Sequence, residues 1–183
     1  MSYLEKTGPW SGYRKIPERL NITWEVLGRQ VERGLGGEPA LLHEGGVLTY
    51  GELSHQVDIF ANGLSRIGIK RADLVLICMS NSPEFAISYL ALVKLGAVPV
   101  LVNSFLTVSE LSFIFNQAKP RFAIAEASKA ESIRKLRLGG LLEKLICVRG
   151  TEGSEICFES LMSGHTRNLG VADTAADDPA FIV

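Results

Sequence analysis

Net charge and cysteine are both scarce in this 183-residue chain. Nineteen basic and twenty acidic side chains leave a formal charge of −1 at pH 7. Nucleic-acid-binding surfaces usually carry a basic excess, so this balance argues against nucleic acid as a partner. The three cysteines, Cys78, Cys147 and Cys157, show neither disulfide nor metal-ligand spacing. We therefore expect a protein of a reducing compartment and predict a cytoplasmic location.

The sequence also lacks the short motifs that identify a reaction. It contains no G-x-S-x-G, no HExxH, no CxxC, and no G-x-G-x-x-G behind a predicted strand. The histidines, His43, His55 and His165, stand in unrelated contexts. Glu52 and Glu110 are better explained as helix-capping residues than as acids or bases. From residue chemistry alone we predict no catalytic residue, no cofactor-binding residue and no metal ligand.

One long apolar stretch resembles a membrane span in length. Phe85–Val102 is eighteen residues with a single charge, at Lys94. Gly96 and Pro99 interrupt it, and a helix-capping signal precedes it. We interpret the stretch as a buried helix followed by a buried strand, so no membrane span is predicted. The first twenty residues are polar, and no secretory signal is predicted there.

Strand and helix signals alternate through residues 73–148. Short, β-rich apolar runs begin near residues 74, 98, 122 and 145, and a helical pattern separates each from the next. The segment Asp73–Asn103 is the clearest unit: a strand, a helix that starts at Ser82-Pro83, a stop at Gly96 and a second strand. This alternation predicts an α/β fold built on a parallel, Rossmann-like βαβ repeat.

Capping and turn signals place further elements. Gly45-Gly46 lies between two short β-like runs, which predicts a hairpin over residues 39–50. Thr49–Glu52 and Thr107–Glu110 have the spacing of capping boxes, so a helix should begin at each. Phe158–Met162 is expected to form a short helix.

Two further helices are predicted with specific faces. Asn21 can cap a helix over residues 22–33, on which Trp24, Leu27 and Val31 should share one face. A basic helix over residues 128–138 should bury Ile133 and Leu136. Its basic side chains should lie on a solvated face; they are Lys129, Arg134, Lys135 and Arg137.

We divide the chain into an N-terminal arm, residues 1–20, and an incomplete domain, residues 21–183. The aromatic side chains of the arm favour a strap across the core over contact with a partner subunit. Residues 163–177 are rich in loop-forming types. Asp178–Val183 begins an apolar strand within which the sequence stops. We therefore expect the domain to be truncated.

Five short motifs follow one another along the chain. They are Leu48-Thr49-Tyr50-Gly51-Glu52-Leu53, Ala61-Asn62-Gly63-Leu64, Asn81-Ser82-Pro83-Glu84-Phe85, Leu90–Val100, and Asn103 with Leu106–Leu111. Each motif alone is weak, because it consists mainly of caps and core positions, but the order and spacing are specific. In this order they resemble the N-terminal part of the adenylate-forming (AMP-binding) superfamily, and specifically its acyl- and aryl-CoA synthetase branch.

The resemblance implies a parent enzyme that activates a carboxylic acid with ATP and Mg²⁺ as an acyl-adenylate and transfers the acyl group to CoA. Asp177–Val183 resembles the strand that precedes the family's phosphate-binding loop, so the loop and the C-terminal domain are absent from this sequence. We predict that residues 1–183 bind none of these cofactors and are inactive alone. The expected partners are the remainder of the protein's own chain and, for the parent, a carboxylic acid. The segment Tyr13–Asn21 is most similar to aryl- and medium-chain acyl-CoA ligases.

One alternative stays open at this point. The chain could be a non-catalytic interaction or scaffold module that keeps the same fold. In that case a partner, for example a second copy in a dimer, should pair with the strand at Phe181–Val183 and cover that sheet edge.

Overall fold

The computed structural model describes residues 16–137, 142–150, 155–164 and 169–183. Its centre is a parallel sheet of five strands in the order β4-β3-β5-β6-β7. Each strand is an apolar run of the kind that a sheet covered on both faces requires. The strands are β3 (Leu74–Cys78), β4 (Val98–Val102), β5 (Phe122–Glu126), β6 (Lys144–Val148) and β7 (Ile156–Cys157). The predicted α/β class and parallel sheet are confirmed.

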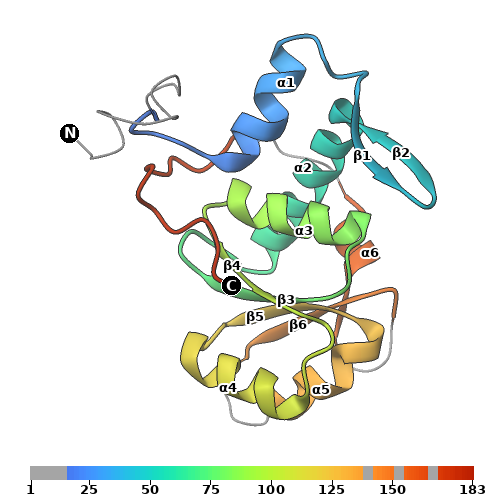
Figure 1. Cartoon of the computed structure of the whole chain (residues 1–183), viewed down its shortest axis with the longest axis vertical. Coiled ribbons are helices and arrows are strands. Elements are labelled where there is room, and N and C mark those ends of the chain that lie inside the picture. The colour runs from blue at the N-terminus through green and yellow to red at the C-terminus, as the bar shows by residue number, and fades with distance from the viewer. Residues whose placement is uncertain (1–15, 138–141, 151–154, 165–168) are drawn as a thin grey trace, which may run out of the picture.

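Helices cover both faces of this sheet and make three layers (Figure 1). One face packs against α2 (Tyr50–Arg66), α3 (Pro83–Lys94) and α6 (Phe158–Leu161). The other face packs against α4 (Val108–Ala118) and α5 (Ala127–Arg137). Among the described residues, no helix combines the length and apolar character that crossing a bilayer requires.

Both predicted capping boxes are present. Thr49 accepts a hydrogen bond from the Glu52 backbone N–H, and the Glu52 carboxylate accepts one from the Thr49 backbone N–H at 2.9 Å. Thr107 and Glu110 repeat the arrangement at the start of α4. These hydrogen bonds favour the ionised acids, so the pKa of each carboxyl lies below its usual value. Both glutamates are therefore structural, as predicted.

The first helix corrects one prediction. Asn21 does cap it, since its side-chain oxygen accepts the Thr23 N–H at 3.1 Å. Trp24–Gly28 is a π-helical turn, however, and α1 (Arg29–Glu32) follows it. The extra residue in that turn rotates everything after it about the helix axis. Leu27 is therefore buried while Val31 is 40% exposed, and the predicted common face does not exist.

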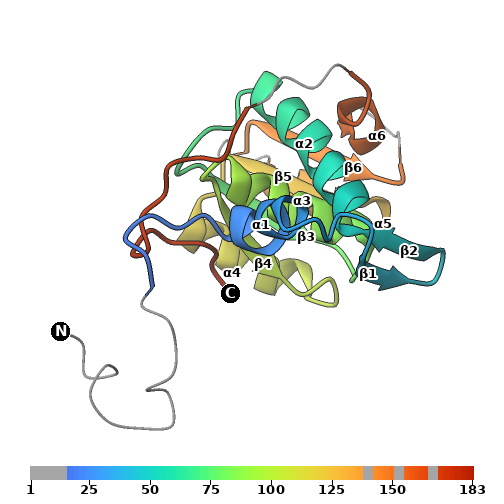
Figure 2. The ribbon, with the colours of Figure 1, turned by 90° about the horizontal axis from the view of Figure 1, so that it is seen from above.

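The hairpin forms as predicted, from β1 (Pro39–His43) and β2 (Gly46–Thr49), and lies at one side of the layered core (Figure 2). The basic helix α5 begins at Ala127 and buries Ile133 as predicted. Its Arg134 is not simply solvated, because it forms an ion pair with the buried Glu155 carboxylate. Leu138, at the end of the predicted helix, lies outside the described residues.

The two ends of the described chain lie side by side. Arg19 and Ala175 form an antiparallel bridge, and the Leu20 N–H donates to the Thr174 carbonyl at 2.9 Å. We call this pairing of residues 18–20 with residues 174–176 the terminal clamp. It agrees with a strap for the end of the predicted arm; residues 1–15 lie outside the described ranges.

The predicted last strand forms only in part. Ile182 donates to the Pro99 carbonyl and accepts from the Leu101 N–H, which adds one parallel bridge to the free edge of β4. Phe181, Ile182 and Val183 all remain exposed. The segment therefore pairs along one side of β4 without entering the core.

Candidate functional site

The carboxyl ends of the strands are where a parallel sheet of this order can hold a ligand. The chain leaves β3, forms β4 on one side of it and then crosses back to form β5 on the other side. The loops after β3 and β5 therefore diverge, and ligands of open α/β sheets bind in the crevice at such a switch point. We call the polar side chains at or just after the ends of β3, β4 and β5 the switch-point cluster; they are Ser80, Ser104, Glu126 and Ser128.

The members of this cluster satisfy one another. The Glu126 carboxylate accepts the Ser80 N–H at 3.3 Å and the Ser128 hydroxyl at 3.0 Å. The Ser80 and Ser104 hydroxyls lie 3.3 Å apart. The Glu126 carboxylate therefore links the loop after β3 to the end of β5 through hydrogen bonds from an amide and a hydroxyl donor. In these three hydrogen bonds the serines pair with a carboxylate or with each other and not with a histidine or lysine base, so they form no activated nucleophile.

An ion pair spans the same edge beside the cluster. Arg149, directly after β6, reaches Glu84 in the first turn of α3 and donates to both of its carboxylate oxygens, at 2.8 and 3.0 Å. Burial opposes ionisation of Glu84. The hydrogen bonds from its own backbone N–H, from Ser82 and from Arg149 outweigh that effect and lower the pKa of this carboxyl. This pair ties the start of α3 to the end of β6.

A thiol also lies at this edge, the Cys78 sulfur at the end of β3. Cys78 ends β3 and is fully buried, and that burial raises the pKa of its thiol to about 11. It therefore stays protonated at neutral pH and cannot attack a substrate efficiently.

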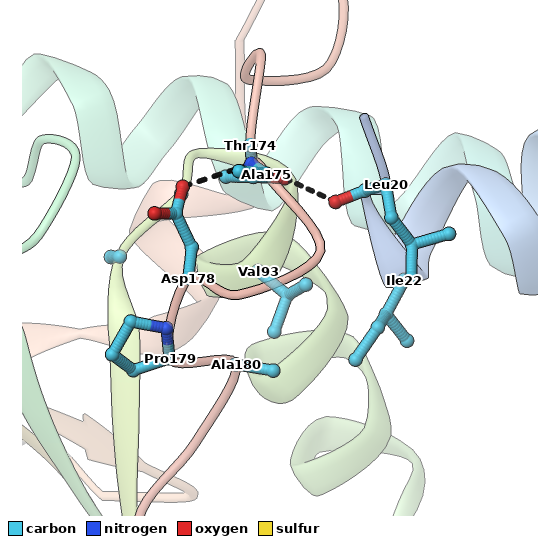
Figure 3. Close-up of a pocket in the computed structure, with 10 residues that line it drawn as sticks. Leu20, Ile22, Val93, Thr174, Ala175, Asp178, Pro179 and Ala180 are labelled. Carbon is cyan, nitrogen blue, oxygen red and sulfur yellow. Dashed lines mark hydrogen bonds between the residues drawn. The ribbon is translucent and has the colours of Figure 1, made fainter. Parts of the chain in front are cut away.

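A small pocket lies away from this edge, against the terminal clamp (Figure 3). Its volume is about 30 Å³, the room of one or two water molecules. Leu20 and Ile22 line one side, Val93 lies beneath, and Asp178 and Ala180 close the other side. Asp178 accepts the Ala175 N–H at 3.0 Å, so its carboxylate is engaged within its own loop. The pocket is a packing gap between the chain ends, too small for a nucleotide or CoA.

The two histidines that the structure describes lie in separate elements, β1 and α2. His43 ends β1, and its Nδ1 accepts the Gly45 N–H. His55 is exposed on α2, and His165 lies outside the described residues. Within the part of the chain that the structure describes, no three histidine, cysteine, aspartate or glutamate side chains gather in a way that could hold a metal ion.

The sequence interpretation named no site residues, and it missed both features at the sheet edge. A signal was present: Ser80, Glu126 and Arg149 are polar side chains at or just after the ends of predicted strands. Strand order decides which of these ends become neighbours, and the sequence alone did not give that order.

Comparisons with known proteins agree on one family. The sequence profile described as "AMP-binding enzyme" matches residues 27–183. Benzoate–CoA ligase of Thauera aromatica is 28% identical over 170 residues, covering 91% of this chain and 32% of the relative. 4-coumarate–CoA ligase 4 of Arabidopsis thaliana is 32% identical over 137 residues, covering 73% of this chain and 24% of the relative. The chain thus spans a third or less of these relatives.

Solved structures show the same fold. The anthranilate CoA ligase AuaEII, crystallised with anthranoyl-AMP, superposes with a TM-score of 0.82 at 22% identity, over 89% of this chain and 32% of that chain. A benzoate CoA ligase from Burkholderia xenovorans LB400 superposes with a TM-score of 0.77 at 23% identity, over 88% of this chain and 32% of that chain. The profile match covers most of the sequence, and on that ground this chain belongs to the AMP-binding enzyme family.

Proposed function

We propose that the chain is the N-terminal part of an ATP-dependent carboxylic acid–CoA ligase. The observation that carries this proposal is the family match over residues 27–183, in which the similar curated proteins are CoA ligases. In such a reaction a carboxylate oxygen attacks the α-phosphorus of ATP and pyrophosphate leaves. The CoA thiol then attacks the acyl carbon and AMP leaves.

We further propose that residues 1–183 perform neither step alone. The groups that would hold ATP and Mg²⁺ are not found among the described residues: the switch-point cluster offers a carboxylate already engaged by Ser80 and Ser128. Polyphosphate needs converging N–H groups or cations, and Mg²⁺ needs free oxygen ligands. The residues present do not fit these cofactors, so we assign them no step and give this part of the chain a scaffolding role.

An aromatic acid is the substrate class that we favour. The curated relatives include ligases named for benzoate and for 3- and 4-hydroxybenzoate. Acetyl-coenzyme A synthetases, for example that of Cupriavidus metallidurans at 29% identity, are also similar, so a short aliphatic acid is the competing class.

Isotope exchange between pyrophosphate and ATP tests both proposals. Pure residues 1–183 should give no acid-dependent exchange with benzoate, 4-hydroxybenzoate, 4-coumarate or acetate. A longer product of the same gene, extended past codon 183, should exchange with an aromatic acid at least tenfold faster than with acetate. Exchange by the short chain would refute its scaffolding role, and a long product without exchange would refute the ligase proposal.

The scaffold-module alternative has its own test. If no reading frame continues past codon 183 and light scattering shows a stable dimer, the module interpretation replaces the ligase proposal. A monomer with a continuing frame contradicts that alternative.

A further inference from the structure

All three cysteines lie in one row across the parallel sheet. Register pairs Cys78 with Ala125 of β5, Ala125 with Cys147 of β6, and Cys147 with Cys157 of β7. Adjacent strands are about 4.8 Å apart. Cys147 and Cys157 are therefore direct neighbours, while Cys78 lies two strands from Cys147, about 10 Å away.

The neighbouring thiols also share one face of the sheet. Ile156 packs with the core on the α2–α3 side. Its neighbour Glu155 points the other way, because its carboxylate meets Arg134 of α5. Successive strand residues alternate faces, so Cys157 points to the α5 side. Cys147 belongs to the core on that side as well.

The two thiols of this pair differ in their exposure to solvent. Cys147 is only 3% exposed, whereas Cys157 is half-buried at the sheet edge and just before α6. A Cβ on Gly150 would come within 3.1 Å of the Cys147 sulfur, so glycine there leaves space beside that sulfur. The Cys157 thiol donates to Glu159 at 2.7 Å. The two Cα atoms of a disulfide usually lie about 4.4–6.8 Å apart. The spacing between neighbouring strands falls within that range.

We propose that Cys147 and Cys157 are a redox pair that closes to an intrachain disulfide when the chain meets a small-molecule disulfide such as oxidised glutathione. Cys157 loses its proton and attacks one glutathione sulfur, which releases one glutathione and leaves a mixed disulfide. Cys147 then loses its proton and attacks the Cys157 sulfur, which releases the second glutathione. The two thiol protons end on the two glutathione molecules, so atoms and electrons balance.

The bond would fix β7 and α6 to β6. The Phe158 ring of α6 lies 4.3 Å from the Phe60 ring of α2, so the constraint extends to the helix layer. The inference is independent of the proposed ligase reaction, since it uses only thiols and a sheet register that are present in this chain.

Peptide mapping after oxidation tests the pair directly. The folded chain is incubated with oxidised glutathione, remaining thiols are alkylated at acidic pH, and the chain is digested with trypsin. Cleavage after Lys144, Arg149 and Arg167 separates the two cysteines, into peptides 145–149 and 150–167. We expect a chain lighter by two hydrogens, these two peptides linked, and Cys78 alkylated only after denaturation.

Single variants identify the order of attack. Cys157→Ser should abolish both the linked peptides and glutathione addition, whereas Cys147→Ser should accumulate glutathione on Cys157. Cys78→Ser should leave the linked pair unchanged. Linkage through Cys78, only intermolecular bonds, or a wild-type chain that stops at the mixed disulfide would each overturn the proposal. The wild-type map decides the matter even if the buried Cys147 variant fails to fold.

Discussion

Replacing Gly63 with alanine should destabilise the protein, although the same change usually stabilises a helix. Gly63 is buried in the last part of α2, where α6 crosses it. A Cβ at this position would lie 2.6 Å from the Leu161 carbonyl oxygen and 2.8 Å from the Leu161 Cβ. Neither atom is the tip of a flexible side chain, so α6 as a whole must move.

Two opposing effects set the magnitude. Glycine to alanine within a helix gains about 1 kcal/mol through backbone entropy. Forcing an extra methyl into a packed contact costs roughly 1–3 kcal/mol, and more when backbone must shift. Displacing α6 also exposes Phe158, which is 4% exposed and whose ring lies against that of Phe60. We expect a net loss of about 1–2 kcal/mol in the free energy of unfolding, taking the overpacking cost as the larger effect.

Urea unfolding followed by far-ultraviolet circular dichroism measures this difference, provided that the slope of the free energy of unfolding against urea concentration is the same in both proteins. Ser65, two residues on and exposed in the same helix, supplies the control. Ser65→Ala should be more stable than Ser65→Gly by about 1 kcal/mol, which measures the helix effect without the contact. A Gly63→Ala variant as stable as the wild type or more so would refute the argument that α6 packs directly on this glycine.

Substitutions at three further positions test other parts of the fold by the same unfolding assay. Leu92 is fully buried in α3, so Leu92→Ala should lower the free energy of unfolding by roughly 3–5 kcal/mol, and Leu92→Asp should give no soluble, cooperatively folding protein. Leu42 is exposed, so the control Leu42→Ala should change little. A cooperatively folded Leu92→Asp protein would count against the burial of Leu92. Thr49→Ala should cost about 1 kcal/mol through the lost cap, and no loss would show that the capping box contributes nothing. Glu84→Gln should be less stable than wild type at pH 7. The pKa of Glu84 is lowered in the folded state, so the stability that its carboxylate contributes is present above the unfolded pKa and is lost as the pH falls through the folded pKa. A stability difference between the variant and the wild type that persists in acid would contradict an origin in the ionised carboxylate.

Local signals predicted most elements because they act over a few residues. The capping boxes place a side-chain oxygen three positions from the N–H that it accepts, so Thr49 and Thr107 were identifiable from sequence alone. Apolar runs with regular spacing gave the strands in the same way. The π-helical turn at Trp24–Gly28 was not predictable, since one extra residue per turn leaves no mark in a 3.6-residue pattern.

Features that depend on strand order could not be predicted. The two-residue strand β7 is too short to show periodicity, and it exists because Ile146 and Cys147 offer a free edge to pair with. Glu155, just before β7, has a buried side chain that is paired with Arg134 of α5, and no local sequence signal indicates this contact. The link between Ser80 and Glu126 follows only from the neighbouring positions of β3 and β5. The hydrogen bonds of Ser104 and Ser128 at the same edge likewise depend on which strand ends are neighbours, and no sequence motif indicates them.

The terminal clamp has a consequence for the order of folding. The Thr174 hydroxyl donates to the Leu20 carbonyl across 154 positions of sequence, whereas β3 and β4 pair within one strand–helix–strand unit. Closing a longer loop costs more chain entropy, so the sheet units should form before the clamp does. On the ribosome, residues 18–20 emerge early but have no partner until residues 174–176 have been made. Residues 18–20, although made early, are thus among the last to reach these native contacts.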